Sequence, residues 1–479
     1  MSLIQGLSNA TSGLGAAARM ASVISANLAN ALTEGYGRRS VLLSAQTTGL
    51  QGAGVQVDAV LRHVDRALQT DRRGAESDMA GQDFLAKALL SVEGIWTGTG
   101  TGDGIAAQLS RVDQALLAAV GDPASDQALG QVVQALKGFA GATNTGASTL
   151  QAQRAEADRQ IADDIATLNA ALLQLEASNE AIAKATYANR ETTALMDARQ
   201  QIVDRIAAIV PIRELDRAGN QIALVTTGGE VLIDGKARQY GFTPSAVITA
   251  DMSLALGSLS GLTRDGVALG GAGFGHLGGG RLEAAFTLRD TILPEAAAAL
   301  DAFAHDMITR FAQADQSQGG SMAALLGDGT ALVPAPPLAG LAQRLQINAA
   351  LDPGQGGNLH LLRDGFAAPA AAEVGDSRQL SLWRQGLGQA RALATGGPAT
   401  DALGHAARLA GQAGQARIWA EDQQTQSAAR WSSLRNSELA MGVDSDAELQ
   451  LLLRVEQAYA ANARVISAID EMFSNLLRI

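Results

Sequence analysis

The chain has 479 residues, a formal net charge of −12 and no cysteine. The absence of cysteine excludes disulfides, thiolate zinc sites and cysteine nucleophiles. The acidic balance argues against nucleic acid and anionic membrane surfaces as partners, because both attract basic surfaces. Apolar residues make up 47% of the chain but aromatic residues only 4%, so we expect a mainly α fold of closely packed helices rather than cores filled with large rings.

The first predicted element is an amphipathic helix from Ser2 to about Ala31. Its apolar residues follow one another by steps of three and four, which is the heptad spacing of a helix that packs against another helix. Ser2 and Gln5 form a capping box at its start, and Gly35 is placed to close it in the left-handed conformation. We find neither the pattern of a secretory signal peptide nor an apolar run long enough for a membrane span, so we expect neither.

The middle of the chain predicts a helical hairpin followed by a β-containing part. Heptad spacing runs through residues 150–186 and again through residues 195–209, and Pro211 ends the second helix. Two β-rich runs then flank Thr-Gly-Gly in "IALVTTGGEVLIDG", which is the pattern of a β-hairpin. We expect a small β-containing domain from there to about residue 270.

Helical patterns return in the second half of the chain. Residues 276–300 predict a helix that is kinked at Pro294. Residues 315–395 are rich in Gly, Pro and Ala without a clear period, so we expect loops and irregular structure there. Residues 398–437 then predict a long helix that leads to the end of the chain.

The last predicted helix repeats the design of the first. It follows the breaker "MGVDSD", where Ser445 and Glu448 form a second capping box. Asn462 lies within its apolar stripe, where a polar residue weakens packing but fixes register. We interpret the two stripes as a seam for self-assembly; the alternative is an antiparallel hairpin that closes an ordinary globule. The predicted seam consists of Leu3, Leu7, Leu14, Ile24, Leu28, Leu452, Val455, Tyr459, Asn462, Ile466, Ile469, Phe473 and Leu476.

Motifs at both ends of the chain point to a known family. "NLANALTEGYGRR", residues 27–39, resembles the signature N-[IL]-[AS]-N-x-x-T-x-G-[YF]-x-R shared by the axial proteins of the bacterial flagellum, which are the rod, hook and hook-associated proteins. "AYAANARVI", residues 458–466, resembles part of the closing helix of the same family. Residues 194–212 and 276–300 resemble segments of the hook-associated proteins at the hook–filament junction. The matching motif residues are Asn27, Asn30, Thr33, Gly35, Tyr36 and Arg38.

The resemblance implies a structural role rather than an enzymatic one. A ring of copies would form the hook–filament junction of the extracellular flagellum and support filament assembly. The chain would be secreted through the flagellar type III apparatus without a cleaved signal peptide. The implied partners are further copies of the chain in a ring or tube, the hook protein, the second junction protein, and an export chaperone on the C-terminal helix.

The resemblance and the shifts of composition together imply a nested chain whose first and last helices pair as a coiled coil. A bundle of helices would form a middle layer, and a β-rich insertion would lie outside it. The predicted domains are a terminal coiled-coil domain of residues 1–45 with 440–479, a helical middle domain of residues 46–210 with 281–315 and 396–439, and an outer β-containing, irregular domain of residues 211–280 with 316–395.

Two alternatives stay open at this point. Within the same family the chain could be a hook or rod protein, although those proteins have no segment like residues 194–212. In another class it could be a nucleotide-binding enzyme, because Gly273, Gly275 and Gly278 have the spacing of a dinucleotide fingerprint. That fingerprint needs a strand directly before it and an acidic residue about twenty positions later, and this sequence supplies neither. Since the five histidines are scattered and no catalytic constellation appears, we expect no enzyme, no cofactor and no metal.

Overall fold

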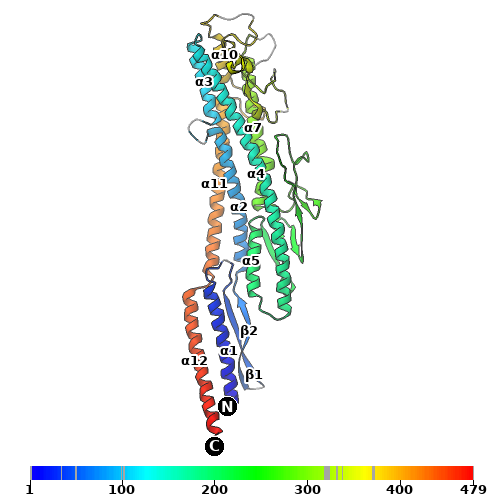
Figure 1. The fold of residues 1–479 in the computed structure, drawn as a ribbon, viewed down its shortest axis with the longest axis vertical. Helices are drawn as coiled ribbons and strands as arrows, with labels where there is room; N and C mark the ends of the chain where they lie inside the picture. The colour runs from blue at the N-terminus through cyan, green and yellow to red at the C-terminus, as the bar shows by residue number, and fades with distance from the viewer. Residues whose placement is uncertain are drawn as a thin grey trace. The chain divides into compact units, whose positions relative to one another are not determined.

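A computed structural model of the chain describes residues 3–477 with a few short gaps. The structure is mainly helical with small antiparallel sheets (Figure 1), which confirms the predicted fold class. The gaps are residues 34, 49–50, 99, 101–102, 318–323, 331–332, 337 and 369–372. The capping box predicted at Ser2 lies outside the described residues.

Twelve α-helices and eleven β-strands follow one another along the described residues. The helices are α1 (Leu3–Ala29), α2 (Arg66–Thr97), α3 (Ile105–Gly121), α4 (Asp126–Tyr187), α5 (Thr193–Ala207), α6 (Gly280–Thr287), α7 (Leu293–Ala314), α8 (Leu341–Arg344), α9 (Leu361–Asp364), α10 (Arg378–Gly388), α11 (Ala402–Ala440) and α12 (Ser445–Leu476). The strands are β1 (Arg39–Thr48), β2 (Gln51–Arg62), β3 (Ile212–Asp216), β4 (Ile222–Thr226), β5 (Val231–Asp234), β6 (Lys236–Ala237), β7 (Tyr240–Gly241), β8 (Thr263–Arg264), β9 (Val267–Ala268), β10 (Leu326–Gly327) and β11 (Gln346–Ile347).

The chain divides into two compact units, and each unit is assembled from segments that are distant in the sequence. The three-domain division predicted from the sequence remains a prediction. Unit 1 consists of Met1–Ser77, Thr167–Gln239 and Ser427–Ile479, and unit 2 consists of Asp78–Ala166 and Tyr240–Gln426.

In unit 1 the first and last helices pack side by side in opposite directions (Figure 1). Ile24 near the end of α1 packs in one buried cluster with Val455 near the start of α12, and Gly13 faces Asn462 farther along the pair. A Cβ atom on Gly13 would lie only 2.8 Å from Nδ2 of Asn462. The pair is therefore close because a residue without a side chain stands opposite the polar residue of the seam.

A long hairpin, β1–β2, follows α1 and packs against it. The sequence did not lead us to expect it. Gly54 has a φ of 110° and lies against Ser12 of α1, whose Oγ accepts a hydrogen bond from the Val55 N–H at 3.2 Å. Register shifts in the two strands mark bulges, which increase the twist of a two-stranded ribbon and let it follow a helix.

The predicted helical hairpin is confirmed as the end of α4 and α5, and the predicted β-hairpin as β4 and β5 in the four-stranded sheet β3–β4–β5–β6. Asn179 of α4 joins the two motifs. Its Nδ2 donates to the Ile222 carbonyl at 2.8 Å, and its Oδ1 accepts from the Ile222 N–H at 3.2 Å. One buried amide therefore satisfies both backbone groups of a strand residue and places the sheet on α4.

Unit 2 contains the larger hydrophobic core. Ring pairs hold its helices together, since Phe303 of α7 meets the edges of Trp96 and Phe139 with ring centroids 5.5 and 6.1 Å apart. Trp383 lies fully buried in α10 and donates from Nε1 to the Leu362 carbonyl at 2.9 Å. The expectation of irregular structure throughout residues 315–395 is therefore wrong for α10, where the few large apolar residues suffice to bury one helical face.

The helix predicted across residues 276–300 is irregular just before Pro294. The helical stretch is interrupted by a π-helical turn, Leu288–Ile292, directly before α7. Pro294 lies in the first turn of α7, but the residues before it are already helical, so its missing N–H leaves a carbonyl of the preceding turn without a helical partner. The π turn contains Arg289, which is fully buried and donates from Nη1 to Asp158 Oδ1 at 2.7 Å. Both the proline and a buried ion pair therefore accompany the irregularity.

Candidate assembly site

Asn27, the first residue of the N-terminal motif, is fully buried near the end of α1. Its Nδ2 donates to the Arg39 carbonyl at 2.8 Å, while its Oδ1 accepts from the Arg39 N–H at 3.0 Å and from the Tyr36 hydroxyl at 2.9 Å. A side-chain amide can do this because it donates and accepts from one planar group. Asn27 therefore fixes the point at which the chain turns back from α1 into β1.

The next motif residues shape the turn itself. Asn30 donates from Nδ2 to the Ala26 carbonyl at 2.9 Å, and Thr33 donates from Oγ1 to Asn30 Oδ1 at 3.3 Å. Gly35 has a φ of 79°, which confirms the predicted left-handed conformation. However, α1 ends at Ala29, so Gly35 does not close the helix. Local side-chain bonds end the helix first, and the glycine then redirects the chain.

Arg38 connects the motif to the C-terminal helix. Its Nε donates to Oε1 of Glu448 at 2.8 Å, and the Glu448 side chain is only 1% exposed. The predicted capping box of Ser445 with Glu448 is wrong, because Asp444 caps α12 by accepting from the N–H groups two and three residues on, each at 3.0 Å. Asp and Ser cap helices about equally well, so residue preference alone could not decide whether Asp444 or Ser445 is the cap.

A single carboxylate, Asp197 of α5, gathers the strands that follow the motif. It accepts from Arg39 Nη2 at 2.7 Å, from Arg62 Nε at 2.6 Å and from the Gly37 N–H at 3.2 Å. All three side chains of this ion-pair cluster are at least 87% buried. Because two arginines share one buried carboxylate, losing Asp197 would leave two buried positive charges without this partner.

Tyr36 is held in its neutral form at this site. Burial raises the pKa of the Tyr36 hydroxyl, and the nearby positive charge of Arg39 lowers it by less than the rise. The Arg39 guanidinium lies 4.8 Å from the centre of the Tyr36 ring, which is cation–π geometry. A neutral hydroxyl is the form that can donate to Asn27, so the pKa shift and the hydrogen bond agree.

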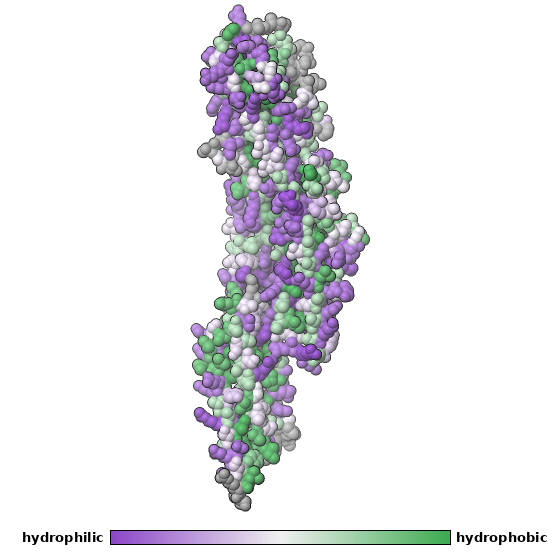
Figure 2. All heavy atoms as spheres, viewed as in Figure 1, coloured by the Kyte–Doolittle hydropathy of each residue, from purple (hydrophilic) through white to green (hydrophobic). Residues whose placement is uncertain are grey.

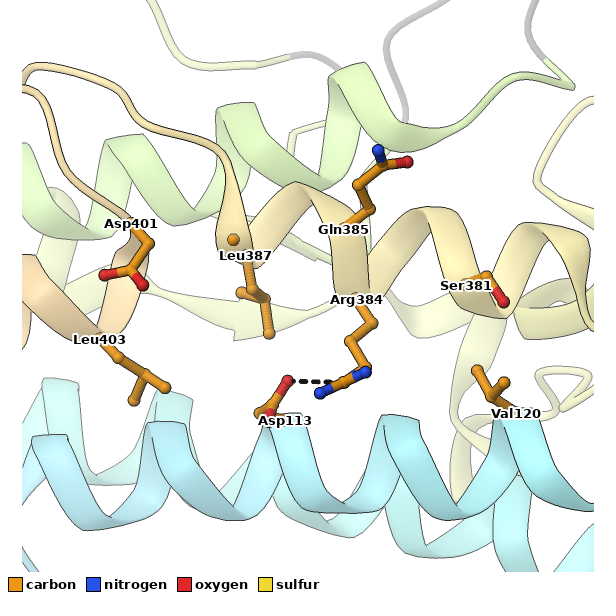
Figure 3. Close-up of a pocket in the computed structure, with 9 residues that line it drawn as sticks. Asp113, Val120, Ser381, Arg384, Gln385, Leu387, Asp401 and Leu403 are labelled. Carbon is orange, nitrogen blue, oxygen red and sulfur yellow. Dashed lines mark hydrogen bonds and ion pairs between the residues drawn. The ribbon is translucent and has the colours of Figure 1, made fainter.

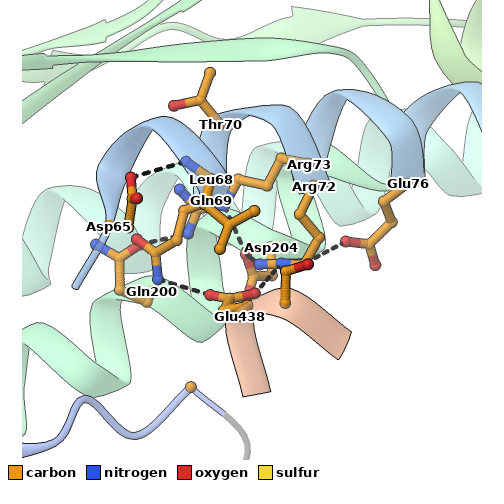
Figure 4. A network of polar contacts seen from close by, with 12 residues as sticks. Asp65, Leu68, Gln69, Thr70, Arg72, Arg73, Glu76, Gln200, Asp204 and Glu438 are labelled. Carbon is orange, nitrogen blue, oxygen red and sulfur yellow. Dashed lines mark hydrogen bonds and ion pairs between the residues drawn. The ribbon is translucent and has the colours of Figure 1, made fainter. Parts of the chain in front are cut away.

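A second polar network ties α2 to the end of α11 (Figure 4). Arg72 pairs with Glu76 and Asp204 at 2.7 Å each and with Glu438 at 2.6 Å, and Arg73 pairs with Asp204 at 2.6 Å. Burial lowers the pKa of Arg72, but the carboxylates around it outweigh that effect and raise the pKa overall. The network therefore acts as a charged clamp between segments that are far apart in the chain. We call the N-terminal motif, Asp197, Glu448 and this clamp together the joint.

The seam residues differ in burial. Tyr459 is 44% and Leu476 59% exposed, so these two keep much of their apolar surface in water. The seam residues that are buried are Ile24, Val455 and Ile469. The seam residues that are partly buried are Leu3, Leu7, Leu14, Leu28, Leu452, Asn462, Ile466 and Phe473. Their role in self-assembly stays a prediction.

Unit 2 contains a separate cavity of about 430 Å³ (Figure 3). It lies between α3 and α10, where Arg384 donates from Nε to Asp113 Oδ1 at 3.0 Å. Among the residues that the structure describes, no group of three or more His, Cys, Asp or Glu side chains could hold a metal ion. Within the same residues, no helix combines the length and the apolar character that crossing a membrane requires.

The Gly-rich segment has no strand–turn–helix geometry in the described chain. Eleven residues separate the two-residue strand β9 from α6. Gly273 has a φ of 90°, and a Cβ atom there would lie 2.8 Å from Leu254. Because a side chain occupies that space, the turn packs against its own chain instead of forming a phosphate cradle.

The paired first and last helices and the Asn-x-x-Asn-x-x-Thr-x-Gly-Tyr-x-Arg motif beside them are the features in which this chain resembles the flagellar axial proteins. Residues 91–327 match the family described as the flagellar hook-associated protein FlgK helical domain, and residues 439–479 match the family described as the C-terminal part of the flagellar basal body rod FlgEFG protein. Residues 91–327 therefore belong to the family of FlgK helical domains.

Individual relatives match over part of the chain. Flagellar hook-associated protein 1 of Salmonella typhimurium is 26% identical over 249 residues, which are 50% of this chain and 44% of that protein. The Bacillus subtilis protein of the same name is 26% identical over 245 residues, 49% of this chain and 48% of that protein. The solved flagellar hook junction protein FlgK from Burkholderia pseudomallei matches with a TM-score of 0.42 and 20% identity over 51% of this chain and 44% of that chain. The chain thus spans less than half the length of these relatives.

Proposed function

We propose that this chain is a structural component of the hook–filament junction of a bacterial flagellum and that filament assembly depends on it. The observation that carries the proposal is the joint, in which Asn27, Arg38 and Glu448 bring the N- and C-terminal helices of one chain together. The match to the FlgK helical domain supports the same role, since the curated relatives are named flagellar hook-associated protein 1.

A structural role also fits the chemistry of the joint. The carboxylates of Asp197, Asp204 and Glu438 are each engaged by arginine side chains of the same chain. Groups that satisfy one another in this way hold chain segments together and leave little capacity to transfer protons to a substrate. We therefore infer that the chain is not an enzyme.

Assembly would be driven by apolar surface that unit 1 leaves in water. Figure 2 shows hydrophobic side chains gathered over the part of the view that α1 and α12 occupy. On α12, Leu449, Leu453, Val465, Met472 and Leu476 are each at least 44% exposed. Burying a side chain of this size contributes about 1.5–3 kcal/mol, so several such contacts offset the ordering of a subunit in a tube.

We infer that the neighbours are further copies in a ring or tube, the hook protein and the second junction protein. An export chaperone would cover the exposed side of α12 until the chain leaves the cell through the flagellar type III apparatus. The mature chain would then lie outside the cell, in the flagellum.

Deleting the gene in the source bacterium tests the proposal. We expect hooks without filaments, filament subunits lost to the medium, and recovery of filaments when the wild-type gene is returned. Cells that lack hooks as well would favour the hook or rod alternative. Cells that keep their filaments and swim normally would contradict the proposal.

Substitutions on α12 test the seam separately. Tyr459→Asp and Ile466→Asp each place a charge on the predicted seam, so we expect incorporation at the hook tip to fall by more than tenfold. Gln457→Asp is the matched control, because it adds the same charge at an exposed polar position of the same helix. If all three variants were incorporated equally well, the seam would not be an assembly surface.

A further inference from the structure

A cavity of about 370 Å³ opens beside the joint, within unit 1. Its polar side is the clamp of Figure 4, since Arg72, Asp204 and Glu438 all line it. Other lining residues come from the turn after α1 and from the connection between α11 and α12. The volume is at the lower end of the roughly 300–1,000 Å³ that binding pockets span.

Three apolar side chains line the same cavity and remain in water. Leu32 is wholly exposed, Leu439 is 65% exposed and Met441 is 53% exposed. A single exposed leucine would need no explanation. Three large apolar side chains from two distant chain segments around one concavity are instead typical of a protein interaction site, and methionine adapts well to a partner's shape.

The far end of the same helix pair also exposes apolar side chains. Ile4 is 72%, Leu476 59% and Leu477 87% exposed, and Figure 1 places both chain ends there, away from α5. With 27 residues, α1 is about 40 Å long. The tip of the pair is therefore about 40 Å from the cavity of its own chain, so any tip that fills the cavity belongs to another subunit.

We propose that the cavity rimmed by Leu32, Leu439 and Met441 receives the C-terminal helix tip of a different axial subunit, the one stacked next along the flagellum. This inference rests on the proposed function, because a junction protein has neighbours of another kind along the axis. Residues 439–479 match the family of rod-protein C-terminal segments, so a tip like that of α12 is shared by axial proteins of several kinds.

The cavity and the helix tip are unlike surfaces at opposite ends of the α1–α12 pair. A contact between unlike ends of two subunits is heterologous and therefore adds subunits along an axis instead of closing a dimer.

Site-specific photo-cross-linking tests the docking in assembled flagella. The gene with benzoyl-phenylalanine at position 32 is returned to the deletion strain, the flagella are irradiated, and cross-linked peptides are identified by mass spectrometry. We expect a cross-link to the last turns of the C-terminal helix of a different axial protein. A cross-link to a second copy of this chain, a cross-link to a non-terminal segment, or no cross-link would overturn the proposal. The same group at Leu117, which is 50% exposed on α3 in unit 2, is the control and should capture no such tip.

A charge at the rim gives a second test. Leu32→Asp should leave thermal unfolding unchanged because Leu32 is wholly exposed, yet it should lower the number of incorporated copies at least tenfold. Leu117→Asp should lower neither. Equal incorporation of the two variants would overturn the docking but not the junction role, whereas normal filaments in the deletion strain would overturn the junction role itself.

Discussion

Asn27 offers the sharpest test of the joint, because one side chain makes three hydrogen bonds while fully buried. A buried hydrogen bond contributes about 1 kcal/mol net, so Asn27→Ala should lower the free energy of unfolding by about 3 kcal/mol. For a unit of 150–250 residues, that loss corresponds to a fall in Tm of roughly 6–12 °C. Tyr36→Phe removes only the hydroxyl bond and should cost about 1 kcal/mol.

Thermal and urea unfolding followed by circular dichroism measure this series. Asn30→Ala is the matched control, because Asn30 is the same residue type in the same motif and bonds only locally, to the Ala26 carbonyl and the Thr33 hydroxyl. We expect it to change stability by no more than about 0.5 kcal/mol. The reasoning would be refuted if Asn27→Ala and Asn30→Ala had equal effects.

Three further predictions concern other contacts of the chain. Asp197→Ala should lower the free energy of unfolding by about 3–5 kcal/mol, because it leaves two buried arginines without this partner. Asp216→Ala is the control and should cost under about 1 kcal/mol, because Asp216 forms an exposed ion pair with Arg66. Equal losses of stability in urea unfolding would contradict this. Gly15→Ala should stabilise α1 by about 0.5–1 kcal/mol, since an added Cβ atom would meet nothing within 4 Å beyond its own stretch of helix. Gly13→Ala should lose that gain, because its Cβ atom would collide with the side-chain amide of Asn462. Equal unfolding midpoints for the two variants would count against the close packing of the helix pair. Hydrogen bonds from the side chain and the backbone N–H of Arg378 lower the pKa of the Asp376 carboxyl to about 2. The stability that Asp376 contributes is therefore fully present above its unfolded pKa near 3.9 and is lost as the pH falls through about 2. A carbon-13 NMR titration of Asp376 with a midpoint near 4 would disprove this.

The helices at the ends of the chain were predictable because their pattern is local. Steps of three and four between apolar residues predicted α1, α5 and α12 to within a few residues. The pairing of the first helix with the last was also predictable, since the apolar stripes of the two helices have the same narrow width. The cap of α12 did not follow, because Asp444 and Ser445 are adjacent and equally suited to the task.

The polar groups of the joint were only partly predictable. The motif residues Asn27 and Arg38 were identified by resemblance, but the pairing of Asn27 with Arg39 and of Arg38 with Glu448 was not predicted. The clamp around Arg72 was missed altogether, because its members come from α2, α5 and α11 and have no fixed spacing in the sequence. Ion pairs between segments that are far apart in the sequence produce no periodic pattern in it. Such pairs can therefore be identified only in the folded structure.

The β1–β2 hairpin was missed for a different reason. Its strands alternate only weakly between apolar and polar residues, and the turn between them has no Asn-Gly or Asp-Gly pair that would signal a tight hairpin. Gly54 reads as a strand breaker in the sequence, whereas in the structure it is the residue that lets β2 approach Ser12. The contact of β2 with α1 is a tertiary feature that the local sequence pattern did not show.

Locating the chain in the flagellum tests the central claim most directly. An epitope inserted at Leu256, an exposed turn residue of unit 2, can be marked with gold-labelled antibody on isolated flagella and viewed by electron microscopy. The account predicts gold at the boundary between hook and filament on each flagellum. Gold distributed along the hook or the filament, or flagella without gold, would contradict it.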